Sequence, residues 1–277
     1  MSTRLRLQDF ADWTSYYREY QIRLTREALL PALRRWGRWH EGLRILDVGC
    51  GDGGAAIALA QAGARLCGIE IEPRRLQGAL RQVEAEGLRL RLDLADVTDA
   101  ASLSNLPGPF DLILFRDVLE HIPAREKALS NCRALLAETG GIVVVFPPYY
   151  SPFGGHQQLL HPPTRLGLPL ARLPWAHCLP RELFRSLARS ADGTDDPQWE
   201  EIERIRATRL TLSSLRRAAR AAGLRATHQD HYLLRPSFAL RYGTPVLGAG
   251  VLGAIPLLAE ILVTGSYQYL EPVKRER

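Results

Sequence analysis

The chain has 277 residues, of which 46% are hydrophobic and 24% are charged. This balance is typical of a globular protein and excludes a largely disordered chain. The length fits one large domain, or one domain with a smaller appendage. The formal net charge is +6, and only two of the 36 basic residues are lysines, so 34 are arginines. The arginine excess leaves nucleic acid, a membrane surface or an anionic substrate open as partners, and codon bias explains it equally well.

The cysteine content indicates a reducing compartment. Four cysteines are too few for a disulfide framework at this length, and none forms a CxxC pair. The first residues also lack the apolar core of a signal peptide. We therefore expect a cytoplasmic location.

Short apolar runs alternate with helical patterns from about residue 43 onward. Strands are expected at 43–49, 64–70, 88–97, 110–115 and 141–146. Helices are expected between them, at 55–62, 74–85 and 124–137. This alternation predicts an α/β fold, in which helices cover both faces of a parallel sheet.

Less regular segments flank this α/β pattern. Before it lies a helical region at about 10–39, and after it a stretch rich in Pro, His, Gly and aromatics, with a short helical patch near 183–188. Regularity resumes with a helix at 211–222 and strands at 224–234 and 262–270. The expected parts are an N-terminal helical lid (1–41), a core (42–147), a cap insertion (148–207) and the C-terminal part of the core sheet (208–277).

One apolar segment requires a separate interpretation. Residues 242–259 carry no charge, which just reaches the roughly 18 residues that a membrane span needs. The segment also contains four glycines and two prolines, and Glu260 follows it. We expect a buried or surface-groove segment rather than a transmembrane helix, and peripheral membrane contact through 242–264 stays open.

The most informative segment is DVGCGDGG at residues 47–54. Glycines at a strand-to-helix turn let the backbone approach a ligand closely. Gly49, Gly51 and Gly54 also fit the GxGxxG pattern, which is a weak signal when it stands alone. Glu70 ends the second strand, where a carboxylate can accept hydrogen bonds from both ribose hydroxyls of NAD or of another adenosine ligand.

Three further features separate these ligands. Asp47 lies two residues before the first glycine of the loop, where it would repel a pyrophosphate and favour a cationic, amine-bearing ligand. Asp96 and Val97 end the third strand, where an acid can accept a hydrogen bond from an adenine amino group. The fourth strand runs directly into FRDVLEHI at 115–122.

Together these segments resemble class I S-adenosylmethionine-dependent methyltransferases of the small-molecule type. ILDVGCGDGG, GIEIEP, ADV and FDLILFRDVLEHI match four motifs of that family in order and at natural spacing. The resemblance covers about 42–146, with weaker support from 208–234. It implies a Rossmann-like, seven-stranded sheet whose last strand, here 262–270, runs antiparallel, and it implies S-adenosylmethionine as the cofactor.

The resemblance also implies which residues contact that cofactor. Those residues are Asp47, Gly49 and Gly51 at the methionine end, Glu70 at the ribose, Ile71, Asp96 and Val97 at the adenine, and Phe115 and Arg116 along the pocket after the fourth strand. Arg116 is bulkier than the residues frequent there, so we expect it to face an anionic substrate. Tyr17, with Tyr16, would close over the cofactor from the N-terminal helix, although core packing explains both equally well.

Methyl transfer from a sulfonium needs a positioned nucleophile and the exclusion of water more than a fixed catalytic triad. A general base is required only when the acceptor is protonated. His156 is the first candidate because the adjacent glycine pair can bring it near the strand ends, and His161 and Tyr149 follow. His121 is expected to pack at the start of its helix.

Two other site readings fail. His156, His161, His177 and Cys178 match no usual zinc-ligand spacing, so no metal site is expected. The segment PPY at 147–149 suggests the NPPY motif of amino-group methyltransferases, but a phenylalanine precedes it and it follows the fifth strand rather than the fourth.

The leading interpretation is a methyltransferase for a small organic acceptor, apolar or lipid-like and of natural-product type. Leu, Pro, Trp175 and Phe184 in the cap favour such a molecule over a polynucleotide. RNA or protein methylation is the alternative that the positive charge supports, and it requires a continuous basic face. A non-catalytic binding module of the same fold is a third hypothesis, and an NAD-linked enzyme is disfavoured by Asp47 and the fourth motif.

Overall fold

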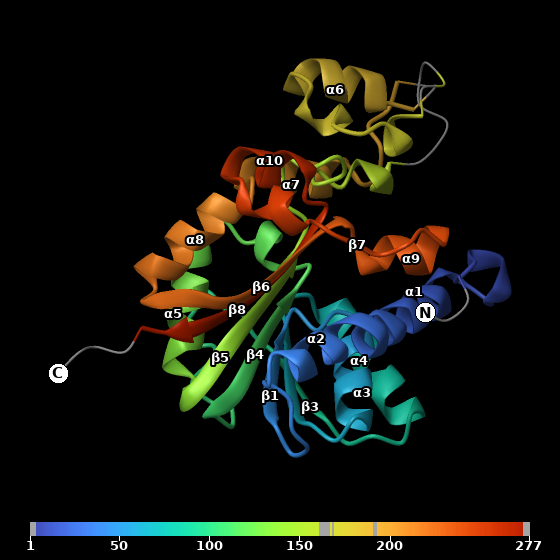
Figure 1. The fold of residues 1–277 in the computed structure, drawn as a ribbon. Helices are drawn as coiled ribbons and strands as arrows, with labels where there is room; N and C mark the ends of the chain where they lie inside the picture. Colours follow the sequence, from blue (N-terminus) through green and yellow to red (C-terminus); the bar gives the residue numbers. More distant parts are fainter. Residues whose placement is uncertain (1–3, 161–166, 168, 191–192, 274–277) are drawn as a thin grey trace.

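The computed structural model describes residues 4–160, 167, 169–190 and 193–273. An eight-stranded sheet lies between two layers of helices (Figure 1). The strands are β1 (Arg44–Val48), β2 (Arg65–Glu70), β3 (Arg91–Leu94), β4 (Phe110–Arg116), β5 (Leu136–Phe146), β6 (Leu224–Leu234), β7 (Leu247–Gly248) and β8 (Gly265–Pro272). The α-helices are α1 (Trp13–Leu24), α2 (Leu30–Arg35), α3 (Gly54–Gln61), α4 (Pro73–Ala85), α5 (Arg125–Ala134), α6 (Arg181–Ala188), α7 (Trp199–Thr208), α8 (Leu212–Ala221), α9 (Pro236–Tyr242) and α10 (Pro256–Leu262).

The strand order is β3-β2-β1-β4-β5-β8-β6-β7. Strands β1 to β5 are mutually parallel, whereas β8 inserts antiparallel between β5 and β6. The expected α/β class and the antiparallel last strand are thereby confirmed. The sheet has one strand more than expected, because the two-residue β7 pairs with the edge of β6. The strand order reverses between β1 and β4, and open α/β sheets bind ligands at such a point.

Two apolar clusters fill the two faces of the sheet. Successive side chains of a strand point to opposite faces, so Ile142 and Val144 of β5 pack in the cluster that includes α5 and α8. Val143 and Val145 pack in the cluster that includes α2 and α3. A strand that is buried on both faces has to be apolar at nearly every position, which explains the continuous run GIVVVF.

The N-terminal helices lie across the start of α3. A π-helical turn, Thr25–Leu29, joins α1 to α2. A Cβ atom on Gly54, the first residue of α3, would come within 2.7 Å of the Gln21 Cβ on α1. The absence of a side chain at Gly54 therefore lets α1 pass close to the glycine loop.

The segment between β5 and α8 contains more helix than its composition indicated. Helix α6 agrees with the expected patch near 183–188, but α7 was not predicted. Phe184 of α6 and Trp199 and Ile202 of α7 form a separate small apolar cluster. The expected cap insertion already contained most of this segment, but its composition did not reveal the helix that packs on α6. The four part boundaries given above stay a prediction.

The uncharged segment 242–259 folds into short elements, which include β7 and the beginning of α10. None of the helices within the described ranges combines the length and the apolar character that crossing a bilayer demands. Several large apolar side chains face outward here, among them Val251, 79% exposed, and Leu257, 70% exposed. The segment is thus neither one long helix nor fully buried.

Glu260 of α10 stabilises the N-terminus of α8, because its carboxylate accepts hydrogen bonds from the N–H groups of Leu212 (2.9 Å) and Ser213 (2.7 Å). We predict that Glu260→Ala lowers the free energy of unfolding by about 1–2 kcal/mol, as loss of a helix N-cap does. Urea denaturation measures this change. The exposed Glu138→Ala control should change stability by less than about 0.5 kcal/mol, and equal effects of the two variants would contradict the capping role.

Candidate functional site

A cavity of about 1410 Å³ opens at the carboxyl ends of the parallel strands. Its wall includes residues at or directly after the ends of β1, β2, β3 and β5, together with residues of α1, α7, α9 and the cap. Pockets for one small ligand usually measure about 300–1,000 Å³. The cavity therefore has room for a cofactor and a second molecule.

The loop after β1 forms one wall of this cavity and turns sharply. Gly49 and Gly51 have φ angles of +67° and +54°, which side-chain-bearing residues rarely adopt. A Cβ on Gly49 would lie 2.7 Å from the Val118 side chain. The N–H groups of Gly49 and Cys50 both donate to the carbonyl of Ile69, at 2.8 and 3.0 Å. The geometry of the backbone and, at Gly49, the closeness of Val118 thus require glycine at these positions.

Glu70 at the end of β2 fixes this loop and also lines the cavity. Its Oε2 accepts a hydrogen bond from the N–H of Gly51 at 2.9 Å. Its Oε1 accepts from the N–H groups of Ile71 (2.9 Å) and Glu72 (3.0 Å). A carboxylate offers about four lone-pair positions, so three backbone donors leave acceptor capacity for a ligand hydroxyl.

Asp47 lies beneath the glycine loop and is only 2% exposed. Burial raises the pKa of this carboxyl group to about 7, although the charge of Arg116 opposes the shift. Its Oδ2 accepts no hydrogen bond from any residue that the structure describes. Neither Asp47 nor Gly51 lines the cavity itself. Since a buried carboxylate without a partner is costly, Asp47 favours a positively charged amine close to the loop.

The structure corrects two expectations about the end of β4. Phe115 is fully buried in the cluster that includes α5 and α8, because alternate residues of β4 face opposite sides of the sheet. Arg116 points toward α1, where its Nη1 donates to the carbonyl of Gln21 at 3.5 Å. Neither residue lines the cavity. Arg116 therefore acts on the charge of Asp47 and is not placed to contact an anionic substrate.

The residues expected at the adenine end all line the cavity. Ile71 is 67% exposed there and offers an apolar surface. The Oδ1 of Asp96 accepts hydrogen bonds from the N–H and the hydroxyl of Thr98, at 2.7 and 2.8 Å. The carbonyl of Val97 accepts from the Asn131 side chain at 2.9 Å. Asp96 thus shapes the turn after β3 as well as facing the cavity.

Aromatic residues of α1 close another side of the cavity. Trp13, Tyr17 and Tyr20 line it, whereas Tyr16 is 6% exposed and packs on Phe10 and Tyr20. The sequence allowed either closure over the cofactor or core packing for both tyrosines, and the structure differs between the two. Tyr17 lies at the cavity, and Tyr16 belongs to the core.

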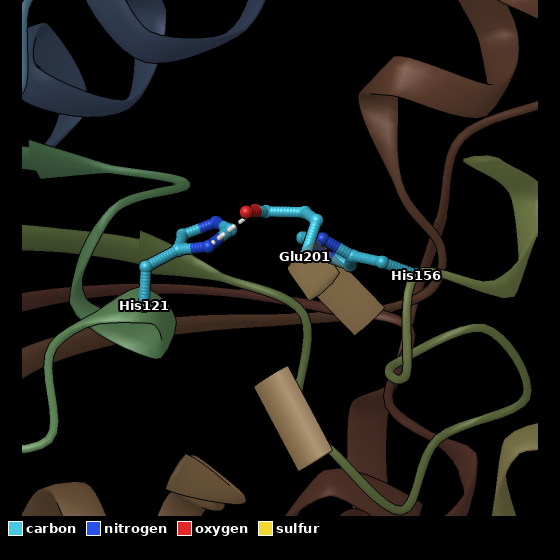
Figure 2. Close-up of side chains that lie close together, drawn as sticks. All are labelled: His121, His156 and Glu201. Atoms are coloured by element: carbon cyan, nitrogen blue, oxygen red, sulfur yellow. Dashed lines mark ion pairs between the residues drawn. The ribbon is translucent and has the colours of Figure 1, made fainter. Parts of the chain in front are cut away.

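Three polar side chains meet at the cap side of the cavity, and Figure 2 shows them pointing toward one another. His121 lies in the 3₁₀ turn Leu119–His121 after β4, His156 follows the glycine pair in the cap, and Glu201 lies in the first turn of α7. The His121 Nδ1 and the Glu201 Oε1 are 2.6 Å apart, and the His121 and His156 rings are 5.5 Å apart. Hence His121 belongs to a polar cluster and is not simply packed in its turn.

Burial and neighbouring charges shift the pKa values of the two histidines in opposite directions. Burial lowers the pKa of His156 to about 3, and the neighbouring His121 adds to the effect. Burial also acts to lower the pKa of His121, but its hydrogen bond to Glu201 and the charge of Glu120 outweigh burial and raise it. The hydrogen bond from His121 lowers the pKa of Glu201 to about 2.

Of the three expected general bases, the structure places His156 at the cavity. Tyr149 is 4% exposed, its ring packs edge-on against His177, and its backbone carbonyl contacts the His177 Nε2 at 2.7 Å. Tyr149 does not line the cavity, because its ring packs on His177 inside the cap. His161 lies outside the described residues.

Several charged residues at the cavity were missed by the sequence interpretation. They are Arg75, Glu201, Arg204, Arg235 and Arg241. The guanidinium of Arg241, for example, lies 4.2 Å from the ring centre of Tyr20 on α1. No local motif marks Glu201 and Arg204 or Arg235 and Arg241, since the first two reach the cavity through the packing of α7 and the last two through that of α9. Arg75 lies in the first turn of α4.

Comparison with known proteins agrees with this geometry. Residues 15–229 match the model of a family described as a methyltransferase domain. With its motifs, its sheet and its glycine loop, the chain belongs to that family, the class I S-adenosylmethionine-dependent methyltransferases.

Curated relatives match the chain in part. The chain is 36% identical to a ubiquinone biosynthesis O-methyltransferase of Methylocella silvestris over 129 aligned residues. The alignment covers 47% of this chain and 49% of the relative. A Caulobacter protein of the same description is 30% identical over 128 residues and is covered over 50% of its length. The chain thus spans about half the length of these relatives.

A solved structure confirms the fold over most of the chain. A SAM-dependent methyltransferase of Methanosarcina mazei aligns with a TM-score of 0.55 at 14% identity, covering 88% of this chain and 98% of the other. At this identity the likeness concerns the fold alone.

We predict that Glu70→Ala lowers the free energy of unfolding by about 2–3 kcal/mol, because three backbone N–H groups lose a charged acceptor. Thermal or urea unfolding of the ligand-free protein measures this effect. Glu72→Ala is the matched control, since Glu72 is exposed and pairs only loosely with Arg75, at 3.4 Å. If both variants were equally stable, Glu70 would not hold the loop.

Proposed function

We propose that the protein is an S-adenosylmethionine-dependent methyltransferase that acts on a small organic acceptor. The observation that carries this proposal is the arrangement of the cavity. Its strand-end side holds Glu70, Asp96 and the glycine loop, and its cap side holds the cluster of His121, His156 and Glu201. One side fits an adenosine cofactor, and the other offers polar groups to a second molecule.

The strand-end residues would hold the cofactor. Asp47 would accept a hydrogen bond from the amine at the methionine end of the cofactor, and Glu70 would accept hydrogen bonds from the ribose hydroxyls. Ile71 would pack on the adenine ring. Asp96 would accept a hydrogen bond from the adenine amino group. The unpartnered oxygen of Asp47 and the free acceptor capacity of Glu70 support this placement. When bound, S-adenosylmethionine supplies a methyl group on a positively charged sulfur, which is a good leaving group.

The remaining residues would position the acceptor and exclude water. Aromatic side chains of α1, including Tyr17, cover the cavity on one side, and the cap covers it on another. His156 and the His121–Glu201 pair reach the cavity wall, where a ring nitrogen can accept the proton of an acceptor hydroxyl. Orientation and exclusion of water supply most of what methyl transfer requires.

We propose an oxygen atom of an apolar or lipid-like, natural-product-type molecule as the acceptor. The curated relatives are described as ubiquinone biosynthesis O-methyltransferases, and the cavity carries apolar cap residues such as Leu159 and Leu160. The exposed apolar residues Leu247, Val251 and Leu257 support peripheral membrane contact through 242–264. Binding to lipid vesicles, lost in Val251→Ser with Leu257→Ser, tests that contact.

Calorimetry with S-adenosylmethionine, followed by transfer of a labelled methyl group to a panel of hydroxylated aromatic acceptors, tests the proposed function. We expect one bound cofactor per chain and labelled product from at least one acceptor. Binding of NADH in place of S-adenosylmethionine would overturn the proposal. Cofactor binding with transfer only to RNA or protein would favour the alternative enzyme class, and no binding of either cofactor would favour a non-catalytic module.

The pH dependence of cofactor binding tests the role of Asp47, whose pKa burial raises to about 7. As the pH falls through 7, this carboxylate takes up a proton and loses the charge that attracts an amine. We predict that the Kd for S-adenosylhomocysteine, which retains that amine, rises by up to about tenfold per pH unit below 7. Calorimetry at several pH values measures how steeply the Kd changes with pH. This dependence should flatten in Asp47→Asn and persist in the exposed Asp99→Asn control.

Measuring both kcat and the Kd for S-adenosylmethionine distinguishes a role of His156 in the reaction from a role in cofactor binding. We predict that His156→Ala lowers kcat by about 10²-fold or more, which is typical for loss of a group that handles a proton. The Kd for S-adenosylmethionine should change less than about twofold, because His156 lies on the cap side. Full activity in this variant would remove His156 from the reaction, and His40→Ala, at an exposed turn, is the control.

A further inference from the structure

His121, His156 and Glu201 come from three separate parts of the chain and meet at one point of the cavity wall (Figure 2). Each offers one ligand atom, and these atoms all lie within 4.8 Å of one another. Imidazole nitrogens and a carboxylate oxygen are the donors that catalytic zinc sites use, where three protein ligands leave a coordination position open. The cluster was not found from sequence, because its residues are separated by 35 and 45 positions.

The separations of the donor atoms are close to those around a metal ion, but one pair of atoms is closer than two ligands of one ion would be. Zinc–nitrogen and zinc–oxygen bonds measure about 2.0–2.2 Å, so two ligands of one ion lie roughly 3.0–3.4 Å apart. The His121 Nδ1 and the Glu201 Oε1 are 2.6 Å apart, which is a hydrogen-bond distance. An ion would therefore take the place of the proton that this pair shares, and the three donor atoms, which lie within 4.8 Å of one another, would draw together around it.

A fourth group, the carboxylate of Glu120, provides independent support. Glu120 is 2% exposed, and neither of its oxygens accepts a hydrogen bond from any residue that the structure describes. Its Oε1 lies 3.8 Å from the His156 Nε2, so it points toward the cluster. A buried carboxylate without a hydrogen-bond donor costs several kcal/mol unless it is paired or near a metal ion. A cation in the cluster would offset that cost.

We propose that His121, His156 and Glu201 bind a divalent cation of borderline softness, such as Zn²⁺, with Glu120 as a neighbouring carboxylate. Two nitrogen donors favour this class over Mg²⁺, which prefers oxygen ligands. The core supplies one ligand, and the cap supplies the other two. The ion thus joins the cap to the end of β4.

The ion also gives the acceptor a place to bind. An acceptor hydroxyl oxygen would occupy the open coordination position, and the ion would lower the pKa of that hydroxyl. When the ion is bound, His121 and His156 coordinate it and do not act as bases, so the hydroxyl proton leaves to solvent. The oxygen lone pair then forms the bond to the methyl carbon, while the carbon–sulfur bond breaks and its electron pair stays on sulfur. This role rests on the proposed methyltransferase function, whereas the binding of the ion does not.

Calorimetric titration of the chelator-treated 277-residue protein with ZnCl₂, in the absence of S-adenosylmethionine, tests the site. We expect one Zn²⁺ per chain and weaker binding of MgCl₂. His156→Ala and Glu201→Gln should each lower the Zn²⁺ affinity by at least about tenfold. The matched controls, His40→Ala and Glu200→Gln, should bind Zn²⁺ as the unmodified protein does. Circular dichroism and thermal unfolding of each ligand-free variant show whether it is folded.

Three outcomes would overturn the proposed site. One is the absence of Zn²⁺ binding, and another is Mg²⁺ binding at least as tight as that of Zn²⁺. The third is Zn²⁺ binding that survives both cluster variants but disappears in Cys178→Ser, since the exposed Cys178 lies 3.4 Å from the His177 ring and offers a competing thiolate. Calorimetry with S-adenosylmethionine on the same samples keeps failure of the metal site distinct from failure of the cofactor site.

Discussion

The carboxylate of Glu70 is the interaction on which the site depends. It connects the end of β2 to the glycine loop after β1 through the N–H of Gly51, and it fixes the start of the next connection through Ile71 and Glu72. Without this acceptor, three backbone donors at the cavity wall would have to find water. The same carboxylate lines the cavity, so the group that orders the loop is also the one offered to the ribose.

The sheet determines which residues can reach the cavity. Parallel strands bring their carboxyl ends to one edge, so Glu70, Asp96 and the glycine loop meet there although the chain separates them. The antiparallel β8 fills the position beside β5 and leaves β6 to carry the chain toward α9. Residues of α7 and α9 then line the cavity from the side that the strands leave open. Figure 1 shows the positions of these helices beyond the end of the sheet.

Much of the core could be predicted from sequence because its signals are local. Apolar runs of strand length, glycines in turns and acidic residues at strand ends are separated by only a few positions, and they pointed to Gly49, Glu70 and Asp96 as cofactor residues. All three line the cavity, and their contact with the cofactor stays a prediction. The prediction for Phe115 was wrong because one step along a strand changes the face. The prediction for Arg116 was wrong because a long side chain can turn toward a buried charge such as Asp47.

The cap could be predicted only in part. Its apolar cluster joins α6 to α7, and the position of Glu201 depends on that packing rather than on any nearby residue. His121 was assigned to helix packing because its partners lie 35 and 80 positions away. Tyr149 was predicted as a candidate general base because its packing partner, His177, lies 28 positions away and no local pattern reveals that contact.

A crystal structure of the protein with S-adenosylhomocysteine tests the proposed cofactor site most directly. We expect the ribose hydroxyls at Glu70, the adenine ring beside Ile71 and Asp96, and the sulfur facing the cluster of His121, His156 and Glu201. S-adenosylhomocysteine bound outside the cavity, or bound with its sulfur directed away from that cluster, would show that the proposed site is wrong.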